Sequence, residues 1–321
     1  MTSVEVQLAI VIVSWNTREL LARCLRSLLA TSDSSAQPFE DEFPLLAFGP
    51  YCAQVFVVDN ASSDASVQMV REHFPWAHLI ENDENVGFAR ANNQAIRQSS
   101  GRYVLLLNSD TEVHRGAVET LVAFMETNPQ AGAVGARLLN ADGSLQPSAH
   151  PMLTPWREFW RLMFLDRLAR KATYGPKLWE AAVPQRVEVI KGACLLLRRE
   201  ALDQVGLFDE SFFFYTEEVD LCYRLCQAGW QLWWVPAATV VHYGEASSKQ
   251  AAQAMYLQLY RSKIQFYRKF GGKTRADCFK RLVRIAYWPR LAMASVGVLF
   301  SPSLAKQAHI YQRLLFELSE M

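Results

Sequence analysis

Short apolar runs alternate with helical patterns through the first half of the chain. Leu8–Ser14 is rich in β-branched residues and indicates a buried strand, and Arg18–Thr31 follows with apolar residues at helical spacing. The alternation continues with strands expected at 54–59, 76–81, 103–107 and 133–138, and helices expected at 65–74, 88–100 and 115–127. Strands and helices that alternate with short connections predict a parallel sheet covered by helices on both faces.

The remaining segments are less regular. Residues 32–53 break the alternation with Ser, Asp, Pro and Gly and predict a surface insertion, and residues 140–186 are rich in Pro, Trp and Arg without a clear period. Further strands are expected at 187–198, 231–235 and 239–242, and further helices at 199–205 and 218–228. From about residue 250 the sequence is patterned as helical and basic to its end. A change of organisation is therefore expected near residue 250.

Polar clusters stand where three of the expected strands end. Residues 14–16 (SWN), 59–60 (DN) and 108–110 (NSD) each follow an apolar run directly. Ligands of open parallel sheets bind beyond the carboxyl ends of the strands, so the three clusters predict a shared site. The carboxylate of Asp110 can hold Mg²⁺ or Mn²⁺ against a diphosphate, or it can cap the next turn. The carboxylate of Asp59 can accept the imide N–H of a pyrimidine base, or it can form an Asx-turn.

The segment 85–93 (NVGFARANN) opens a helix in a way that allows two interpretations. Gly87 permits close approach of the backbone to a ligand, and a helix N-terminus favours a phosphate. Asn92 and Asn93 are poor helix formers, which indicates a local role. They either contact a ligand or form a buried hydrogen-bond bridge between elements.

Acidic residues and one histidine add candidate chemistry in the second half. Glu217, Glu218 and Asp220 head the helix expected at 218–228, where the helix dipole stabilises acids. A carboxylate at this position could also act as a general base toward an attacking hydroxyl. His242 ends an apolar strand, which is typical of a buried core histidine, and the alternative is a second ligand for a cation held by Asp110.

Composition narrows the range of partners. The 321 residues include 33 basic and 32 acidic residues, so the chain lacks the positive excess that nucleic-acid binding requires. Its six cysteines include no CxxC pair and are expected to be small buried hydrophobes in a reducing compartment. No signal-peptide pattern and no uninterrupted apolar window of about 20 residues occurs, so we expect a cytoplasmic location.

The segment after residue 250 combines basic and aromatic residues with the apolar run 292–300. This composition suits peripheral contact with an anionic membrane surface, at the inner face of the cell membrane. The alternative is a helical subdomain that packs on the rest of the chain or forms a homodimer.

Seven segments together resemble the family 2 inverting glycosyltransferases with the GT-A fold, and most closely their rhamnosyltransferase-like branch. They are VIVSWN (11–16), VVDNASSD (57–64), NVGFARANN (85–93), LLLNSDT (105–111), KGACLLLRREAL (191–202), VGLFDESFFFYTEEVDLCYRL (205–225) and VVHYG (240–244). Their order and spacing match the family over roughly 8–245. The resemblance implies an α/β GT-A catalytic domain at 1–249, with a nucleotide-binding half at about 1–139 and an acceptor-binding half at about 140–249. Residues 250–321 would form a helical extension.

The resemblance also implies roles for single residues. Asp59 matches the family's base-contacting aspartate, Asp110 the last position of its DxD metal motif, and His242 a histidine that often joins the metal. Glu218 stands where most relatives carry the aspartate that acts as general base, with Glu217 as the alternative. The implied donor-binding residues are Ser14, Asn16, Asp59, Asn85, Gly87, Asn92, Asn108, Ser109 and Asp110, and the implied acceptor-side residues are Gly192, Ala193 and Asp220.

Two positions depart from the family pattern. Asn108 replaces the first aspartate of DxD, which leaves one carboxylate for the cation, and Glu218 is one methylene longer than the usual aspartate. With Mg²⁺ or Mn²⁺, the resemblance implies inverting transfer of a sugar from dTDP-rhamnose or a UDP-sugar. The acceptor would be a glycan or a lipid-linked acceptor in bacterial cell-surface polysaccharide synthesis.

The sequence leaves two alternative functions open and disfavours two others. A UDP-hexose or N-acetylhexosamine transferase of the same fold and a catalytically silent sugar-nucleotide-binding protein remain alternatives. A nucleotidyltransferase or a Rossmann dehydrogenase is disfavoured, because Ser-Trp-Asn-Thr rather than a glycine-rich loop follows the first strand.

Overall fold

The computed structural model describes residues 6–33, 44–244, 252–297 and 302–321. These residues form two compact units. The first unit is drawn from 1–150, 176–213 and 217–250, and the second from 151–175, 214–216 and 251–321.

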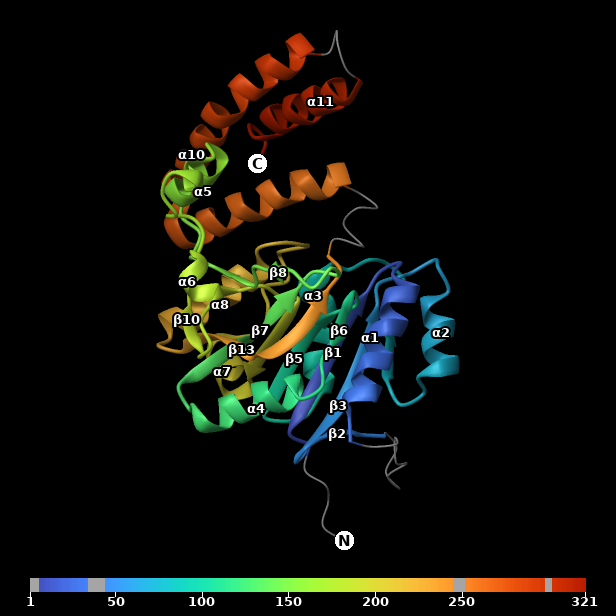
Figure 1. Ribbon diagram of the computed structural model, residues 1–321. Helices are drawn as coiled ribbons and strands as arrows, with labels where there is room; N and C mark the ends of the chain where they lie inside the picture. Colours follow the sequence, from blue (N-terminus) through green and yellow to red (C-terminus); the bar gives the residue numbers. More distant parts are fainter. Residues whose placement is uncertain (1–5, 34–43, 245–251, 298–301) are drawn as a thin grey trace. The chain divides into compact units, whose positions relative to one another are not determined.

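The first unit is built around an 11-stranded sheet (Figure 1). The order along the sheet is β10-β13-β7-β12-β5-β1-β3-β2, with β4, β6 and β8 pairing beside β3, β13 and β7. The strands are β1 (Leu8–Ser14), β2 (Leu46–Phe48), β3 (Tyr51–Asp59), β4 (His78–Glu81), β5 (Tyr103–Asn108), β6 (Thr111–Val113), β7 (Ala131–Leu139), β8 (Leu145–Gln146), β10 (Gln185–Val187), β12 (Cys194–Arg198) and β13 (Gln231–His242). A separate pair is formed by β9 (Ala149–His150) and β11 (Val189–Ile190).

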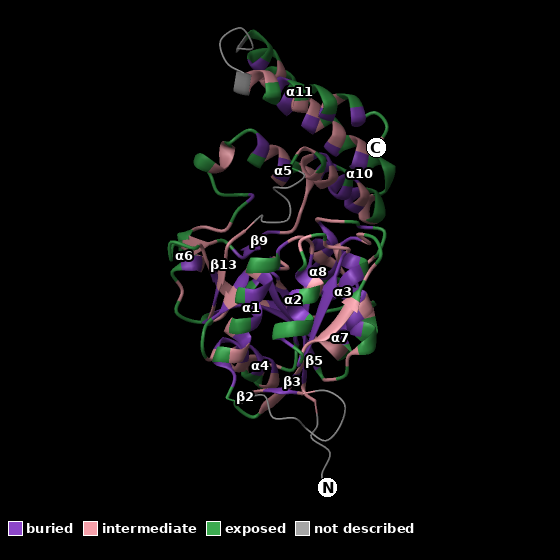
Figure 2. Cartoon of the chain, turned by 90° about the vertical axis from the view of Figure 1, so that its right-hand side faces the viewer, coloured by how far each residue is buried: buried purple, intermediate pink, exposed green. Residues whose placement is uncertain are grey.

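Helices of the first unit cover both faces of this sheet. They are α1 (Arg18–Thr31), α2 (Ser66–His73), α3 (Phe88–Gln98), α4 (Ala117–Thr127), α6 (Pro176–Trp179), α7 (Arg199–Val205) and α8 (Glu217–Gln227). Alternate residues of β1, such as Ile10 and Ile12, share one core with apolar residues of α1 and α4. The intervening residues point to the opposite face, where α3 contacts β1. Figure 2 shows the result, with buried strands and exposed outer sides on α1 and α2.

Strand directions place the polar clusters together. β1 pairs in parallel with β3 and β5, so Ser14 lies opposite Asp59, and Asn108 lies beside Val13. The predicted parallel arrangement is confirmed for β4-β3-β1-β5 and for β7 with β13. The sheet as a whole is mixed, because β2, β6, β8, β10 and β12 pair antiparallel with their neighbours. Strand β12 runs antiparallel between β5 and β7.

Other boundaries also differ from the prediction. The expected insertion at 32–53 contains β2 and the first residues of β3, and residues 34–43 of it lie outside the described residues. The single strand expected at 187–198 is two strands, β11 and β12, separated by a short connection. The two strands expected at 231–235 and 239–242 are one strand, β13, whose register with β7 shifts between Val235 and Thr239. Pro236 lies at that shift, because a proline cannot donate a ladder hydrogen bond.

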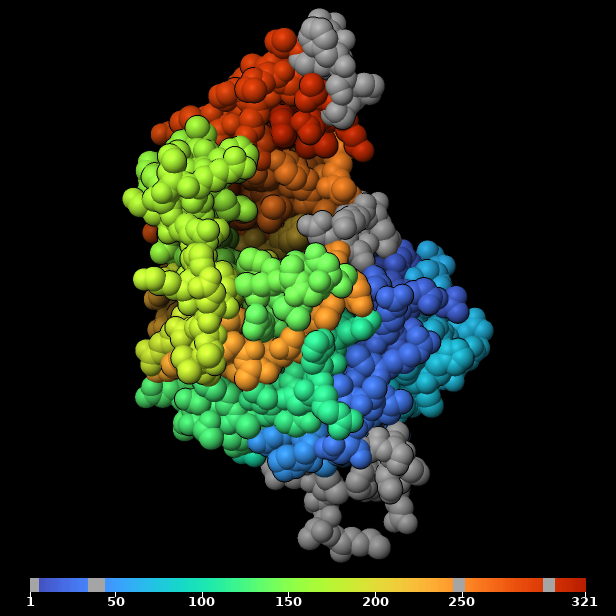
Figure 3. Space-filling model, in the orientation of Figure 1, coloured from blue at the N-terminus to red at the C-terminus, as the bar shows by residue number. Residues whose placement is uncertain are grey.

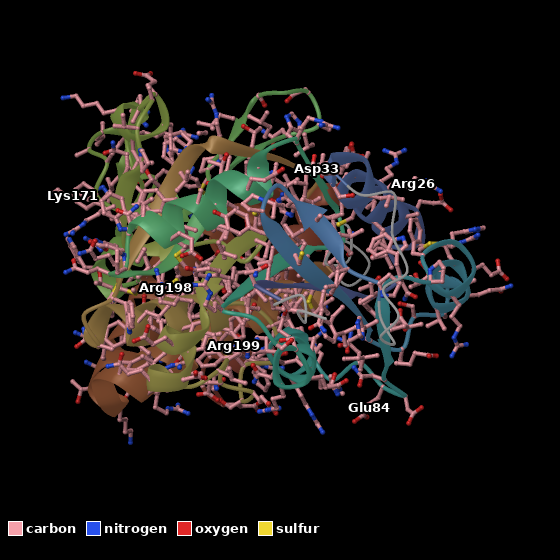
Figure 4. All side chains as sticks on the ribbon, turned by 90° about the horizontal axis from the view of Figure 1, so that it is seen from below. Arg26, Asp33, Glu84, Lys171, Arg198 and Arg199 are labelled. Atoms are coloured by element: carbon pink, nitrogen blue, oxygen red, sulfur yellow. The ribbon has the colours of Figure 1, made fainter. Side chains whose placement is uncertain are left out.

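Two neighbouring arginines close the side of the sheet where β5 begins, and both are labelled in Figure 4. Arg198 donates to the carbonyl oxygens of Met125, Asn128 and Ala131 at the end of α4. Arg199 donates to the carbonyls of Ile96 and Gly101 and to the hydroxyl of Ser99 at the end of α3. One carbonyl in the last turn of each helix, that of Met125 in α4 and that of Ile96 in α3, thereby gains a side-chain donor.

The second unit consists of α5 (Pro155–Leu162), the 3₁₀ turn η1 (Leu165–Arg167), α10 (Ala252–Gly297) and α11 (Pro302–Glu317). Gly272 interrupts α10 with a positive φ of 66°, so α10 is two helices joined at a kink. Within this unit the buried Glu158 of α5 forms ion pairs with the buried Lys263 and with the partly exposed Arg161. Burial opposes its ionisation, but the two cations lower the pKa of Glu158 to about 2. Among the residues described, no helix combines the length and hydrophobicity needed to cross a lipid bilayer.

The helical nature of the C-terminal segment was predicted. The grouping of residues 151–175 with these helices was not, because the sequence analysis placed them in the segment 140–249. The pairing of Glu158 with Lys263 explains the grouping. The roles assigned to the two halves of 1–249 stay predictions.

Candidate active site

A chain of buried hydroxyls links the ends of β1 and β5. The hydroxyl of Thr17 lies 3.0 Å from that of Ser14 and 2.8 Å from that of Ser109. All three residues are buried. Ser14 and Ser109, two of the predicted site residues, are therefore linked through Thr17. Thr17 was not among the predicted site residues.

Asp59 forms the Asx-turn that was one of its two interpretations, and its contact with a base stays a prediction. Its Oδ2 accepts a hydrogen bond from the backbone N–H of Ser62 at 2.8 Å, which is the Asx-turn. Its Oδ1 is buried and has no hydrogen-bond partner among the described residues. Buried carboxylate oxygens are normally hydrogen-bonded, so an unpaired one at a strand end is a site for a donor from a ligand.

Asn16 stabilises the loop beside Asp59. Its backbone has a positive φ of 51°, and its Oδ1 accepts a hydrogen bond from the backbone N–H of Ser63 at 2.7 Å. Its own N–H donates to Ser62 Oγ at 2.9 Å. Asn16 thus fixes the turn that presents Asp59.

Asp110 and His242 converge although 132 positions separate them in the sequence. Strand β6 follows Asp110 and pairs antiparallel with β13, so that His242 lies opposite Thr111. His242 Nε2 is 3.3 Å from Asp110 Oδ1 and 3.3 Å from Asn108 Nδ2. Figure 3 shows that the orange residues of β13 lie against the green residues of the β7–β8 region.

This pair fits a divalent cation. Two ligands placed about 2.1 Å from one cation at right angles lie about 3 Å apart, close to the observed Asp110–His242 separation. In the described parts of the chain no group of three or more His, Cys, Asp or Glu residues could hold a metal. Two protein ligands suffice for Mg²⁺ or Mn²⁺ when phosphate oxygens and water complete the coordination.

The loop at 191–193 approaches the same place. The carbonyl of Ala193 accepts a hydrogen bond from the backbone N–H of Asn108 at 3.1 Å. A side chain at Gly192 would meet the ring of Phe88 at 3.7 Å, which is ordinary contact. The structure therefore brings this predicted acceptor-side loop beside the Asn108–Asp110 segment.

The segment 85–93 is engaged with the protein itself. A Cβ at Gly87, whose φ is 85°, would lie 2.5 Å from the carbonyl oxygen of Phe213, so packing alone requires glycine here. Asn93 exchanges hydrogen bonds with the backbone of Phe208 at 2.8 and 3.1 Å, which is the buried bridge given as the alternative.

The two other predicted residues of this segment also bond locally. Asn85 Oδ1 accepts from the N–H of Gly87 at 3.0 Å, and Asn92 Nδ2 donates to the carbonyl of Phe88 at 2.8 Å. Donor contacts for Asn85, Gly87 and Asn92 stay predictions, and each has a structural role that accounts for its identity.

The two glutamates that begin α8 differ in burial. Glu217 is buried, and its Oε2 has no hydrogen-bond partner within the described residues. Burial, followed by the nearby charge of Glu218, raises the pKa of Glu217 well above its usual value. A carboxyl that keeps its proton is a poor base, whereas Glu218 is only partly buried. The role of general base stays a prediction for Glu218, with Glu217 as the alternative.

The start of α8 is tied to the end of β3 through Gly87. Phe213, four residues before Glu217, accepts the N–H of Phe88 at 2.8 Å, and the carbonyl of Gly87 accepts from Asn60 Nδ2 at 3.3 Å.

Asp220 is not placed where an acceptor could reach it. It is fully buried, and its Oδ2 accepts a 2.8 Å hydrogen bond from Arg224 Nε. Arg224 in turn donates to the carbonyls of Val205, Gly206 and Leu207. The acceptor contact expected of Asp220 is replaced by a structural role, because its charge is used to anchor the loop before α8.

Comparison with known families gives one match over most of the chain. The family model described as glycosyl transferase family 2 matches residues 9–206. The N-acetylglucosaminyl-diphospho-decaprenol L-rhamnosyltransferase of Mycobacterium tuberculosis is 33% identical over 212 residues, which cover 59% of this chain and 66% of that protein. Rhamnosyltransferase WbbL of Escherichia coli is 24% identical over 207 residues, which cover 61% of this chain and 75% of that protein. The chain thus spans just under two thirds of the mycobacterial relative.

Solved structures share the fold at low sequence identity. A mannosyltransferase from Pyrobaculum calidifontis in complex with GDP-Man and Mn²⁺ has a TM-score of 0.52 and 16% identity, over 99% of this chain and 87% of that chain. GalNAc-T7 with UDP, GalNAc and Mn²⁺ has a TM-score of 0.52 and 17% identity, over 75% of this chain and 44% of that chain. These similarities confirm the predicted GT-A fold.

Proposed function

The chain belongs to glycosyl transferase family 2, and we propose that it is a metal-dependent, inverting glycosyltransferase that takes its sugar from a nucleoside-diphosphate donor. The observation that carries the proposal is the convergence of Asp110, Asn108 and His242 at the end of β5. At the end of β3, with β1 between the two, Asp59 Oδ1 is buried and has no hydrogen-bond partner among the described residues. A diphosphate and a base would be bound at neighbouring strand ends, as in other open α/β sheets.

Asp110 and His242 would hold Mg²⁺ or Mn²⁺, and such a cation neutralises the charge that builds on a diphosphate leaving group. The two structural neighbours named above were both solved with Mn²⁺, which supports this choice of ion. Asp59 Oδ1 accepts the imide N–H of a uracil or thymine base, because no donor among the residues that the structure describes reaches this acceptor. Asn16 holds the loop in which this acceptor is presented.

Glu218 completes the transfer. Its carboxylate takes the proton of an acceptor hydroxyl as that oxygen bonds to the anomeric carbon. The bond from the anomeric carbon to the diphosphate breaks on the opposite side, so the nucleoside diphosphate leaves and the configuration inverts. Burial and the charge of Glu218 raise the pKa of the neighbouring Glu217, which favours its neutral form.

The donor sugar is proposed to be L-rhamnose. The names of the mycobacterial and Escherichia coli relatives support rhamnose, and the mycobacterial name supports a lipid-diphosphate-linked acceptor in polysaccharide synthesis. UDP-hexose or UDP-N-acetylhexosamine is the alternative donor. We also propose a cytoplasmic location, as expected from the sequence.

A panel of donors tests the proposal. Thermal unfolding with Mn²⁺ is measured with dTDP-rhamnose, UDP-glucose, UDP-N-acetylglucosamine and GDP-mannose. A ligand at 100 times its Kd stabilises the folded state by about 2.7 kcal/mol, which shifts the midpoint measurably. We expect the largest shift with dTDP-rhamnose, and we expect Asp110→Asn to lose the Mn²⁺-dependent part. Equal, metal-independent shifts for wild type and variant would contradict the metal site.

One face of α10 supports a second proposal, peripheral contact with an anionic lipid surface. After the kink, Ile285, Trp288, Ala292 and Val296 recur at helical spacing and are exposed, with 61% of Trp288 accessible. A spacing of four residues separates Lys280 from Arg284 and Arg284 from Trp288. The two basic residues therefore lie on the same side of the helix as the exposed apolar residues. Burial, followed by the charges of Arg268, Arg284 and Lys273, lowers the pKa of Lys280, and the charge of Asp277 opposes this shift.

Exposed apolar and basic residues in adjacent rows match a surface of anionic lipids. Flotation with phosphatidylglycerol-containing and phosphatidylcholine vesicles measures this contact. Replacing Ile285 and Trp288 by Ser is expected to abolish binding to the anionic vesicles. Phe316→Ser on α11 is the matched control, because Phe316 is equally exposed outside this row. Equal flotation of both variants would overturn the proposal.

A further inference from the structure

Gln146 is held against His242 by a short hairpin. Strand β8 pairs antiparallel with β7, with Gln146 opposite Leu138. The turn between them is closed by Asn140, whose N–H donates to the carbonyl of Ser144 at 2.8 Å, and by Gly143, which adopts a φ of 80°. From this position Gln146 Oε1 lies 2.6 Å from His242 Nδ1.

The orientation of the Gln146 amide is determined by a backbone group. Its Nε2 lies 3.2 Å from the carbonyl oxygen of His242 and 2.8 Å from Asn140 Oδ1. A backbone carbonyl can only accept a hydrogen bond, so the amide nitrogen must face it. The amide oxygen is therefore the atom that faces the imidazole ring.

This orientation selects one tautomer of the ring. Gln146 Oε1 can only accept, so His242 Nδ1 must carry a proton and donate it. In the neutral ring Nε2 then carries the lone pair. That lone pair lies 3.3 Å from Asp110 Oδ1, at the place where the proposed cation would be shared.

Asn108 also favours the proton on Nδ1, because it contacts the other ring nitrogen, Nε2. Its Nδ2 lies 3.3 Å from His242 Nε2 and donates to the lone pair. The amide groups of Asn108 and Gln146 therefore bracket the ring and favour a proton on Nδ1, whereas the Asp110 carboxylate, 3.3 Å from Nε2, favours a proton on Nε2 until a cation lies between the two. A carboxylate at position 108 would accept rather than donate, and would favour a proton on Nε2. The departure of this chain from the DxD pattern is thus coupled to the state of its histidine.

We propose that Gln146 is a positioning residue, which fixes the Nδ1–H tautomer and the ring orientation of His242 and so keeps Nε2 available as a ligand. The inference rests on the proposed function only in assigning His242 to the cation. Partners of the non-ligating nitrogen are a general requirement of metal-binding histidines, and their loss weakens metal affinity by about 10–100-fold.

Three variants separate positioning from packing. Gln146→Leu keeps the size of the side chain but removes the acceptor, and Gln146→Glu keeps an acceptor for Nδ1–H. Asn140→Ala removes one partner of the Gln146 amide but leaves the carbonyl of His242 in place. We expect Gln146→Leu to lose the Nδ1–H tautomer, and we expect Gln146→Glu and Asn140→Ala to retain it.

The first measurement is the tautomer itself. Long-range ¹H–¹⁵N correlation spectra of protein labelled at histidine report which ring nitrogen carries the proton, and the His242 signal is identified by its loss in His242→Gln. The second is Mn²⁺ affinity, measured by electron paramagnetic resonance with Mn²⁺ alone. Gln146→Leu is expected to bind about 10–100-fold more weakly, with Gln146→Glu close to wild type.

Each outcome decides one question. A Gln146→Leu variant with the wild-type tautomer and Mn²⁺ affinity overturns the role of Gln146. If wild type and Asp110→Asn bind Mn²⁺ equally, the proposed cation site fails instead, and the tautomer spectra still decide what Gln146 does.

Discussion

Polar groups are paired very differently on the two sides of the central sheet. Where β5 begins, Arg198 and Arg199 satisfy the last carbonyls of α4 and α3, and the positive φ angles nearby belong to Gly49 and Gly101. Where β5 ends, the buried Oδ1 of Asp59 has no partner among the described residues. In the neighbouring loops, Asn16, Ala61 and Ala65 have positive φ angles. This backbone conformation is unfavourable for residues that carry a Cβ.

The difference separates groups that stabilise the fold from groups held ready for a ligand. An unpaired buried carboxylate oxygen and left-handed non-glycine residues each lower stability by roughly 1–3 kcal/mol. Such features persist where the surrounding structure fixes them and a ligand uses them. Substitutions on the side where β5 ends should therefore change ligand binding or catalysis with little change in stability. Substitutions on the side where β5 begins should lower stability with little change in binding or catalysis.

The largest effect is expected from Glu218→Gln. The amide cannot take a proton from the acceptor hydroxyl, so kcat should fall by about 10²–10⁴-fold while donor affinity and the unfolding midpoint stay the same. Single-turnover transfer and isothermal titration with Mn²⁺ measure the two quantities. Glu217→Gln is the matched control, because burial raises the pKa of Glu217 and so favours its neutral form, which glutamine resembles. Loss of turnover in the control alone would move the base role to Glu217.

Asp59→Asn should weaken donor binding without weakening the fold. The new amide can keep the turn by accepting from the N–H of Ser62 and would present N–H groups to the base. Losing a hydrogen bond to a charged group corresponds to roughly 1.5–3 kcal/mol, or about 10–200-fold in Kd. Isothermal titration measures the affinity, and denaturant unfolding should show unchanged or higher stability because a buried charge is removed. A variant that is destabilised but binds normally would make Asp59 a structural residue.

The strand ends that carry these residues could be predicted because a buried parallel strand has a recognisable apolar run. The meeting of Asp110 and His242 was expected from the family resemblance, and the structure places them in contact. Strand β12 could not be predicted as antiparallel, because a run such as CLLLR carries no information about direction.

The role of Gln146 could not be predicted for a different reason. It lies in a two-residue strand, too short to show any period, and its partner His242 is 96 positions away. The grouping of residues 151–175 with α10 likewise depends on a charge pair between Glu158 and Lys263, which are 105 positions apart. Pairings of this kind are set by tertiary packing rather than by local pattern.

On the other side of the sheet, Arg199→Ala should lower the free energy of unfolding by about 2–3 kcal/mol. Three acceptors at and just after the end of α3 lose the Arg199 guanidinium, and of these the carbonyl of Ile96 keeps a hydrogen bond from Ser99 Oγ. The value of kcat/KM per folded molecule should not change. Arg102→Ala is the control, because Arg102 forms an exposed ion pair with Glu126, and such pairs contribute less than about 1 kcal/mol. Equal destabilisation by both variants, in urea titration, would contradict the structural role of Arg199.

The smallest effect tests whether backbone strain near the site serves the ligand. Ala65 precedes α2 with a φ of 63°, and Ala61 lies two residues after Asp59 with a φ of 60°. Replacing alanine by glycine relieves about 1–2 kcal/mol of left-handed strain in the folded state. It also costs roughly 0.5–1 kcal/mol, because glycine has more conformational freedom in the unfolded state. The free energy of unfolding of each Ala→Gly variant should therefore rise by about 0.5 kcal/mol.

The two variants should differ in donor binding. Ala65→Gly should bind the donor as wild type does, whereas Ala61→Gly loosens the turn that presents Asp59 and should bind about two- to threefold more weakly, because a less organised site has more freedom to lose. Urea unfolding and isothermal titration measure the pair. If both variants gain stability and neither loses affinity, the left-handed residues at this side of the sheet are incidental to binding. The contrast between the two sides would then rest on Asp59 alone.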